Sequence, residues 1–191
     1  VLDRAVAILE LLAVHAEGLP LHEVADRLTL PRSATHRLLN DLARHGYVRQ
    51  DREQGPYVLT TKLVTLAFTF LSHSGIVDVA QPVLDRLAQQ TGELVRLGVI
   101  DGDRLTWLAK AQGARSGLRY DPDMGMEAHL SCTANGHAWL ACLTDEQALT
   151  LAARQGFGRP GQFGQPAPRT DAALLKRLRL ARERGYAMVT D

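Results

Sequence analysis

The sequence predicts an α+β protein in which a small helical domain with a hairpin precedes a larger mixed domain. Three observations carry this prediction. Apolar residues recur at helical spacing in three short segments before residue 45. Two β-prone triplets then flank a polar Gly-Pro turn at residues 51–56. After residue 91 strand-like and helix-like segments alternate, and 46% hydrophobic residues in a chain of 191 supply a sizeable core.

Glycine and proline separate the front helices. We expect the first helix over residues 3–14, because a Gly-Leu-Pro stretch follows it. The second has apolar residues at i, i+3, i+4 and i+7. The third begins at Pro31, whose missing N–H costs nothing at a first helical position, and runs to Arg44. Residues 47–49 and 57–59 form the hairpin, so this part is a predicted winged helix-turn-helix.

The third helix has an apolar and a polar side. Its predicted buried stripe comprises Ala34, Leu38, Leu39 and Leu42. The opposite stripe and its N-terminal rim are polar and comprise Arg32, Ser33, Thr35, His36, Arg37 and Asn40. Small hydrogen-bonding and planar multi-donor groups match base edges and phosphates in the major groove. We therefore expect this helix to read DNA; the alternative is a solvated helix in a winged-helix module that only dimerises.

The charge pattern is local. Formal net charge is only +1, which excludes a general electrostatic attraction to nucleic acid. Residues 31–45 carry three arginines against one aspartate, a net charge of +2, whereas residues 1–55 carry seven arginines against eight acidic residues. We therefore expect modest non-specific affinity for DNA. Base-specific contacts and dimerisation should supply a larger share of the binding free energy.

Behind the hairpin, residues 61–74 form a predicted helix that is mostly apolar and must be covered by another domain or another copy of the chain. The second domain begins with an amphipathic helix. We expect it to continue with strands at 94–100, 104–109 and 118–120, helices at 134–143, from Thr144 onward and at 170–184, and a strand from Tyr186 to Val189. A chain that stops as a strand begins predicts an incomplete domain. The predicted division is 1–60, 61–75 and 76–191.

At this point the sequence resembles the IclR family of bacterial transcriptional regulators along essentially its whole length. The stretches that carry the resemblance include LHEVADRLTLPRSATHRLLNDLARHGYV, YVLTTKLVTLA, CTANGHAWLACL and RERGYAMV. The resemblance implies a homodimeric or homotetrameric regulator whose winged helix binds a palindromic operator. It also implies a GAF-like α/β effector domain that binds a small metabolite, often a carboxylate. The family includes repressors and activators.

The resemblance assigns DNA contacts to Arg32, Ser33, Thr35, His36 and Arg37, with Arg4 as a helper at the phosphate backbone. Asn40 joins them from its place on the polar stripe. The wing is the predicted hairpin at residues 47–59. Within it, Pro56 stands where the family commonly has a basic or polar residue. Arg49 and Arg52 remain as candidate phosphate contacts.

The resemblance places the effector-cradling segment at Leu130, Ser131, Cys132, Thr133 and Ala134. Free N–H groups at a helix start suit an anionic group, and ordinary helix capping by Ser131 or Thr133 is the alternative. Arg119 could pair with a carboxylate, or it could be an exposed strand-end arginine. Trp107, Met124 and Trp139 line an apolar pocket or belong to the core. His137 replaces the family's usual lysine, and Val189 stands where an acidic residue is frequent.

Other classes of protein find less support. Cys132 and Cys142 are ten residues apart, which is neither a metal-ligand nor a disulfide spacing, so we expect reduced thiols, no metal, no cofactor and no catalytic residues. A GAF-type sensor or thiol enzyme using Cys132 is the alternative, although His137 does not share its helical face and no third group orients the pair. No apolar run approaches the ~20 residues that span a bilayer, so we expect a cytoplasmic protein.

Overall fold

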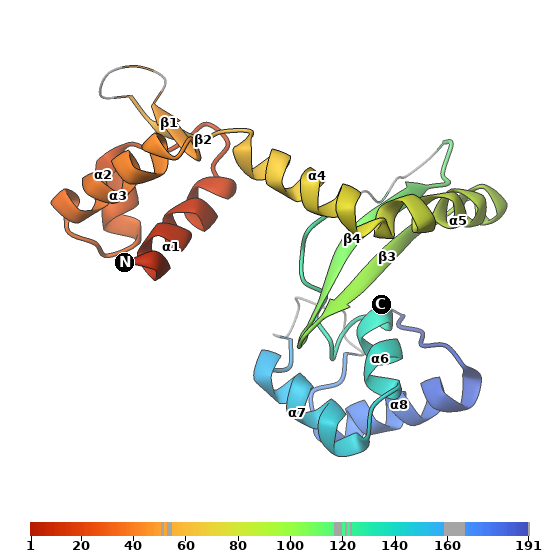
Figure 1. Cartoon of the computed structure of the whole chain (residues 1–191). Helices are drawn as coiled ribbons and strands as arrows, with labels where there is room; N and C mark the ends of the chain where they lie inside the picture. The colour runs from red at the N-terminus through yellow and green to blue at the C-terminus, as the bar shows by residue number, and fades with distance from the viewer. Residues whose placement is uncertain are drawn as a thin grey trace. The chain divides into compact units, whose positions relative to one another are not determined.

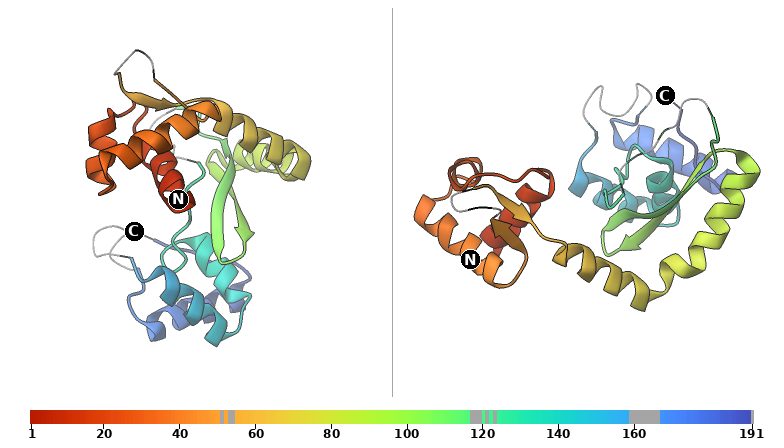
Figure 2. Two further views of the ribbon diagram at one scale, coloured as in Figure 1. Left: turned by 60° about the vertical axis from the view of Figure 1, so that its left-hand side comes forward. Right: turned by 90° about the horizontal axis from the view of Figure 1, so that it is seen from above.

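The computed structural model describes residues 1–50, 52, 55–116, 120, 122, 124–158 and 167–190. The chain divides into two compact units, Val1–Ser74 and Gly75–Asp191 (Figures 1 and 2). Both units contain helices and a two-stranded antiparallel sheet, which confirms the predicted α+β class. The finer division at residue 60 stays a prediction.

The first unit begins with the predicted three helices and hairpin. These are α1 (Leu2–Ala13), α2 (Leu21–Arg27), α3 (Arg32–Arg44), β1 (Val48–Gln50) and β2 (Tyr57–Leu59). The prediction placed Pro31 inside the third helix, whereas its extended backbone makes it the N-cap of α3. The core of this unit is built from one face of each element: Ile8, Leu12, Val24, Leu38, Leu39, Val48 and Tyr57 are buried.

A contact between the α1–α2 connection and the β1–β2 hairpin was missed from the sequence. Leu19 and Tyr57 exchange two backbone hydrogen bonds, of 3.0 and 2.8 Å, which adds a single-residue bridge to the edge of the hairpin. Gly18 makes this approach possible because its φ is +77°. A Cβ at Gly18 would collide with the carbonyl oxygen of Tyr57 and the side chain of Val58.

Helix α4 (Lys62–Ser74) leaves the hairpin as predicted. Its start is tied to the end of α3, because the Lys62 ammonium donates to the carbonyl of His45 at 2.6 Å and lies 4.8 Å from the centre of the Tyr47 ring. No residue of α4 is buried. Its apolar side chains are therefore exposed in the single chain, including Val64, Leu66, Phe68 and Phe70.

The second unit is a β-hairpin with helices on one face and at one end (Figure 1). Its elements are α5 (Ile76–Thr91), β3 (Leu94–Asp101), β4 (Arg104–Gln112), α6 (Ala134–Ala141), α7 (Asp145–Gln155) and α8 (Asp171–Arg184). Helix α5 packs on one face, where Leu84 and Ala88 meet Ala109 and Ala111. At the turn end a second core joins the hairpin to α6, α7 and α8 through Leu105, Leu130, Leu140, Ala148, Leu174 and Leu178.

A β-bulge divides the two cores. Leu97 is opposite Ala109 but Gly98 is opposite Trp107, so Leu108 is the extra residue on β4. Ala109 packs against α5, whereas Trp107 packs with the core of α6 to α8. The bulge thus turns Trp107 away from α5.

Helix boundaries in the second unit follow the predicted caps. Thr144 and Gln147 form the predicted capping box at the start of α7. Thr170 caps α8, and Gly185 ends it in the left-handed conformation.

The predicted strand at residues 118–120 stays a prediction, because residues 117–119 lie outside the described part of the chain. Residues 125–128 run beside β4, where the Ala128 N–H donates to the Leu105 carbonyl at 2.7 Å. The predicted strand from Tyr186 to Val189 is wrong: the described residues after α8 form no strand. A strand needs a neighbouring backbone to complete its hydrogen bonds, and no described segment provides one.

Within the described part of the chain, no single helix is long and apolar enough to cross a membrane, although α4 and α5 together, broken at Gly75, meet that test by length and composition alone. No group of three or more His, Cys, Asp or Glu side chains among those residues is placed to hold a metal ion.

Candidate nucleic-acid interface and effector site

Helix α3 presents a continuous polar surface. Its buried side contains Leu38 and Leu39, and this places the predicted polar stripe outward. The exposed members are Arg32, Ser33, His36, Arg37 and Asn40. The Asn40 amide lies 3.4 Å from the His36 ring, so these two side chains contact each other along the stripe. The arrangement offers amide, imidazole, hydroxyl and guanidinium groups from one helix face.

Thr35 is a correction to the predicted interface. It was expected at the exposed rim of the helix, but its side chain is 0% exposed. Its hydroxyl donates to the carbonyl oxygen of Pro31 at 3.2 Å, one turn earlier. Thr35 therefore belongs to the buried side of the helix, because it lies three and four positions before the buried Leu38 and Leu39 and so shares their helix face.

A groove of about 420 Å³ borders this helix on the wing side. Its lining joins α2, α3 and the hairpin and comprises Pro20, Leu21, His22, His36, Gln50, Gly55 and Tyr57. The Gln50 amide donates to the carbonyl of Gly55 at 2.8 Å and so fixes the base of the wing. His22 and Gln50 were missed from the sequence, because only the fold brings α2 and β1 beside His36.

The remaining predicted DNA contacts are exposed arginines. Arg4 lies on α1, Arg49 on β1, and Arg52 in the turn of the hairpin. Arg44, at the end of α3, is also exposed but forms an ion pair with Asp41.

The predicted effector-cradling segment lies directly before α6 and is mostly buried. Leu130, Ser131 and Cys132 are 1%, 0% and 9% exposed. Gln155 of α7 fixes the segment by accepting from the Leu130 N–H at 2.7 Å and donating to the Ala128 carbonyl at 3.0 Å. Gly136 is required there, since a Cβ would collide with the backbone of Leu130.

Two polar groups of this segment have structural partners. Thr133 is the N-cap of α6: its hydroxyl accepts from the Gly136 N–H at 3.1 Å and donates to the His129 carbonyl at 3.0 Å. This is the capping alternative left open from the sequence. The Ser131 carbonyl accepts from Nε2 of His137 at 2.8 Å. A ligand role for Ser131 and Thr133 stays a prediction.

Burial lowers the pKa of His137 below its ordinary value; the hydrogen bond to Ser131 opposes this shift and the charge of Arg177 adds to it. Burial also lowers the pKa of His129, against the opposing charge of Glu127. Both rings are thereby favoured in the neutral form.

Cys132 is buried, and its Sγ lies 3.4 Å from the hydroxyl of Ser131, which in turn lies 3.2 Å from the His129 ring. A nucleophilic thiol needs an electropositive and solvent-accessible setting, whereas the Cys132 thiol is buried. Cys142 is exposed.

Of the other predicted effector residues, Arg119 lies outside the described residues. Met124 is half-buried. Trp107 is half-buried and carries the guanidinium of Arg96 over its ring, 3.8 Å from the centroid. Burial lowers the pKa of Arg96, and the Tyr120 phenol opposes the shift. The contact of Arg96 with Trp107 was missed from the sequence because it depends on the β-bulge, which places Trp107 on the same face of the hairpin as Arg96.

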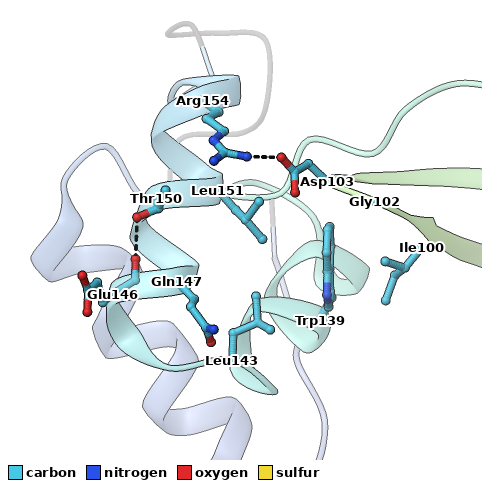
Figure 3. Close-up of a pocket in the computed structure, with 10 residues that line it drawn as sticks. All are labelled: Ile100, Gly102, Asp103, Trp139, Leu143, Glu146, Gln147, Thr150, Leu151 and Arg154. Atoms are coloured by element: carbon cyan, nitrogen blue, oxygen red, sulfur yellow. Dashed lines mark hydrogen bonds and ion pairs between the residues drawn. The ribbon is translucent and has the colours of Figure 1, made fainter.

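A pocket of about 640 Å³ lies at the turn of the hairpin, between it and α6 and α7 (Figure 3). Ile100, Trp139, Leu143 and Leu151 give it an apolar wall, and Figure 3 shows the ion pair of Arg154 with Asp103 on its rim. Of the residues singled out from the sequence as pocket-lining, it contains Trp139 and none of Trp107, Met124 or 130–134.

Family models match both units. Residues 1–52 match the IclR helix-turn-helix domain, and residues 68–191 match the C-terminal domain of bacterial IclR transcriptional regulators. The chain is 33% identical over 187 residues to the HTH-type transcriptional regulator BhcR of Paracoccus denitrificans. This alignment covers 98% of this chain and 65% of BhcR. It is 30% identical over 192 residues to XynR of Escherichia coli, covering 99% of this chain and 73% of XynR.

Among solved structures, an IclR homologue from Microbacterium hydrocarbonoxydans, crystallised with 4-hydroxybenzoate, superposes with a TM-score of 0.77 at 21% identity, over 97% of this chain and 75% of that one. This likeness shows the fold. The chain spans about two thirds to three quarters of the length of these relatives.

The two units together define a winged helix-turn-helix protein with a C-terminal α/β domain. The chain belongs to the IclR family of bacterial transcriptional regulators.

Proposed function

We propose that the chain binds a specific DNA operator through α3 and the wing, and that a small organic acid held by the second unit modulates this binding. The single observation that carries the DNA part is the exposed stripe of Ser33, His36, Arg37 and Asn40 on α3. In a winged helix-turn-helix the third helix enters the major groove, where Arg can bridge guanine and Asn can bridge adenine.

Phosphate contacts come from exposed arginines around this stripe. Arg32 lies at the start of α3, where free N–H groups also favour an anion. Arg4, Arg49 and Arg52 are the flanking candidates. Thr35 is excluded from the proposal because it is buried.

The effector part rests on the second unit. Support comes from the half-buried Trp107, which packs with the core cluster that contains Leu130, and from the homologue crystallised with 4-hydroxybenzoate. Met124, which is also half-buried, remains a proposed lining residue. Arg119 remains a proposed carboxylate partner outside the described residues. The proposed role is regulatory and not enzymatic, in line with the relatives named as transcriptional regulators.

Self-association completes the proposal. An operator made of two half-sites is read by a two-fold symmetric dimer. The uncovered apolar surface of α4 supports a dimer through this helix, with a tetramer as the larger assembly.

A gel-shift assay with DNA from upstream of the gene that encodes the chain tests the proposal. We expect a specific complex that survives excess unrelated competitor DNA and weakens as salt rises. The DNA part fails if no salt condition gives a shift. A thermal-shift screen of organic acids tests the effector part, since a ligand at 100 times its Kd adds about 2.7 kcal/mol to the unfolding free energy.

The competing assignments predict different results. A module that only dimerises predicts that replacing Ser33, His36 and Arg37 alters assembly and leaves DNA binding absent. A thiol enzyme predicts that alkylating Cys132 abolishes a measurable turnover, which the burial of this thiol argues against.

A further inference from the structure

The face of the β3–β4 hairpin opposite α5 carries two cations side by side. Arg96 and Lys110 are directly opposite each other in the antiparallel register, so both project from the same face. The Lys110 ammonium donates to the carbonyl of Pro122 at 3.2 Å, which holds it along that edge.

The guanidinium of Arg96 is fixed but incompletely paired. It stacks on the ring of Trp107 with 3.8 Å between the guanidinium carbon and the ring centroid. Its Nε is buried and has no hydrogen-bond partner among the described residues. A buried donor without an acceptor destabilises the folded chain, and more so where the group is charged.

The stacked arginine lies on the face of β3 that meets the start of α6. Gly98, two residues along β3 on the same face, lies so close to α6 that a Cβ there would approach the Asn135 amide to 3.0 Å. Asn135 directly follows the segment 130–134 in the first turn of α6. Arg96, Trp107 and the start of α6 therefore border one region of the second unit.

We infer that Arg96 anchors the carboxylate of an organic-acid effector, with its guanidinium held flat by Trp107. The inference rests on the proposed effector function and adds to it the residue that recognises the acid. A planar guanidinium presents parallel N–H donors that match the two oxygens of a carboxylate. A neutral amide of the same shape offers one acceptor oxygen and no negative charge. It therefore leaves one N–H donor of the guanidinium without an acceptor and the positive charge without a counter-ion.

The test is a thermal-shift and calorimetric titration of the full chain with acetate, succinate, benzoate and 4-hydroxybenzoate, each beside its primary amide. We expect at least one acid to raise the unfolding temperature while its amide does not. Arg96→Met keeps the apolar stem over Trp107 and should weaken binding of that acid by about 10- to 100-fold. Arg96→Lys should retain part of the affinity.

Arg104→Met is the matched control, because Arg104 is an exposed arginine on the same hairpin and pairs with Glu127 at 3.8 Å. It should bind the acid as the wild type does. Without ligand, Arg96→Met should melt no lower than the wild type, because it removes an unsatisfied buried donor. A marked fall would show that Arg96 is structural and would overturn the inference.

The remaining outcomes distinguish a failure of the Arg96 role from a failure of the proposed effector function. Equal binding of the acid by the wild type and Arg96→Met, or equal binding of acid and amide, overturns the role of Arg96 and leaves an effector site elsewhere. Failure of every acid to bind the wild type overturns both the organic-acid function and this inference. A parallel operator-binding assay shows whether the DNA function stands.

Discussion

The hydroxyl of Thr35 donates to the carbonyl oxygen of Pro31 across the first turn of α3, from a position with no exposed surface. Its neighbour Ser33 is exposed on the same helix. Two hydroxyl residues two positions apart therefore have separate roles, one in the fold and one at the interface.

Thr35→Val and Ser33→Ala should have opposite effects. Thr35→Val keeps the shape and removes one hydrogen bond, so we expect it to lower the unfolding free energy by about 1 kcal/mol and to leave operator affinity unchanged. Ser33→Ala should leave stability within about 0.5 kcal/mol of the wild type and weaken operator binding. Urea unfolding and fluorescence anisotropy measure the two quantities. If Thr35→Val loses DNA affinity while its unfolding free energy is unchanged, Thr35 contacts DNA and the account is wrong on this point.

The apolar surface of α4 predicts a dimer that one charge can disrupt. Phe68 is 64% exposed in the single chain, and a copy of the helix would cover it. Phe68→Glu should therefore shift the protein to monomer and weaken operator binding, because a lone half-site contact is weaker.

Thr69→Glu is its control, since Thr65, Thr69 and His73 follow one another at i, i+4 and i+8 on a polar stripe of the same helix. It should leave the mass unchanged in light scattering. A wild type that is already monomeric at micromolar concentration would refute the α4 interface.

Burial of His137 predicts a loss of stability in mild acid. Its pKa in the folded chain is lowered from about 6.5, so the unfolded chain binds the proton first as the pH falls. The unfolding free energy should be fully retained above pH 6.5 and should decline as the pH drops from there toward the lowered folded-state pKa. His129 contributes with the same sign.

His137→Gln isolates this effect, because glutamine can still donate to the Ser131 carbonyl but does not titrate. We expect its melting temperature to fall less than that of the wild type between pH 7.5 and 5.5. Parallel curves for the two proteins would show that His137 titrates normally.

Much of the architecture was predictable from local signals. Helix starts and stops followed Pro20, Thr144, Thr170 and Gly185, because capping and left-handed turns act within a few residues. The outward stripe of α3 followed from helical spacing alone.

The errors came where distant segments decide the outcome. Tyr186 to Val189 is β-prone, but a strand also requires a partner backbone, which spacing cannot supply. Thr35 looked exposed because polar residues surround it in the sequence, whereas the fold turns it inward. Arg96 was overlooked because the bulge at Leu108 places Trp107 beneath it.

Operator affinity of Arg37→Ala compared with Arg44→Ala tests the central claim most directly. Both changes remove one positive charge from α3, but Arg37 lies in the exposed stripe and Arg44 is already paired with Asp41 at the far end. In anisotropy titrations at one salt concentration, a helix that reads bases predicts a loss of about 1–3 kcal/mol of specific binding for Arg37→Ala and much less for Arg44→Ala. Equal losses for the two variants, or no loss for either, would contradict the account.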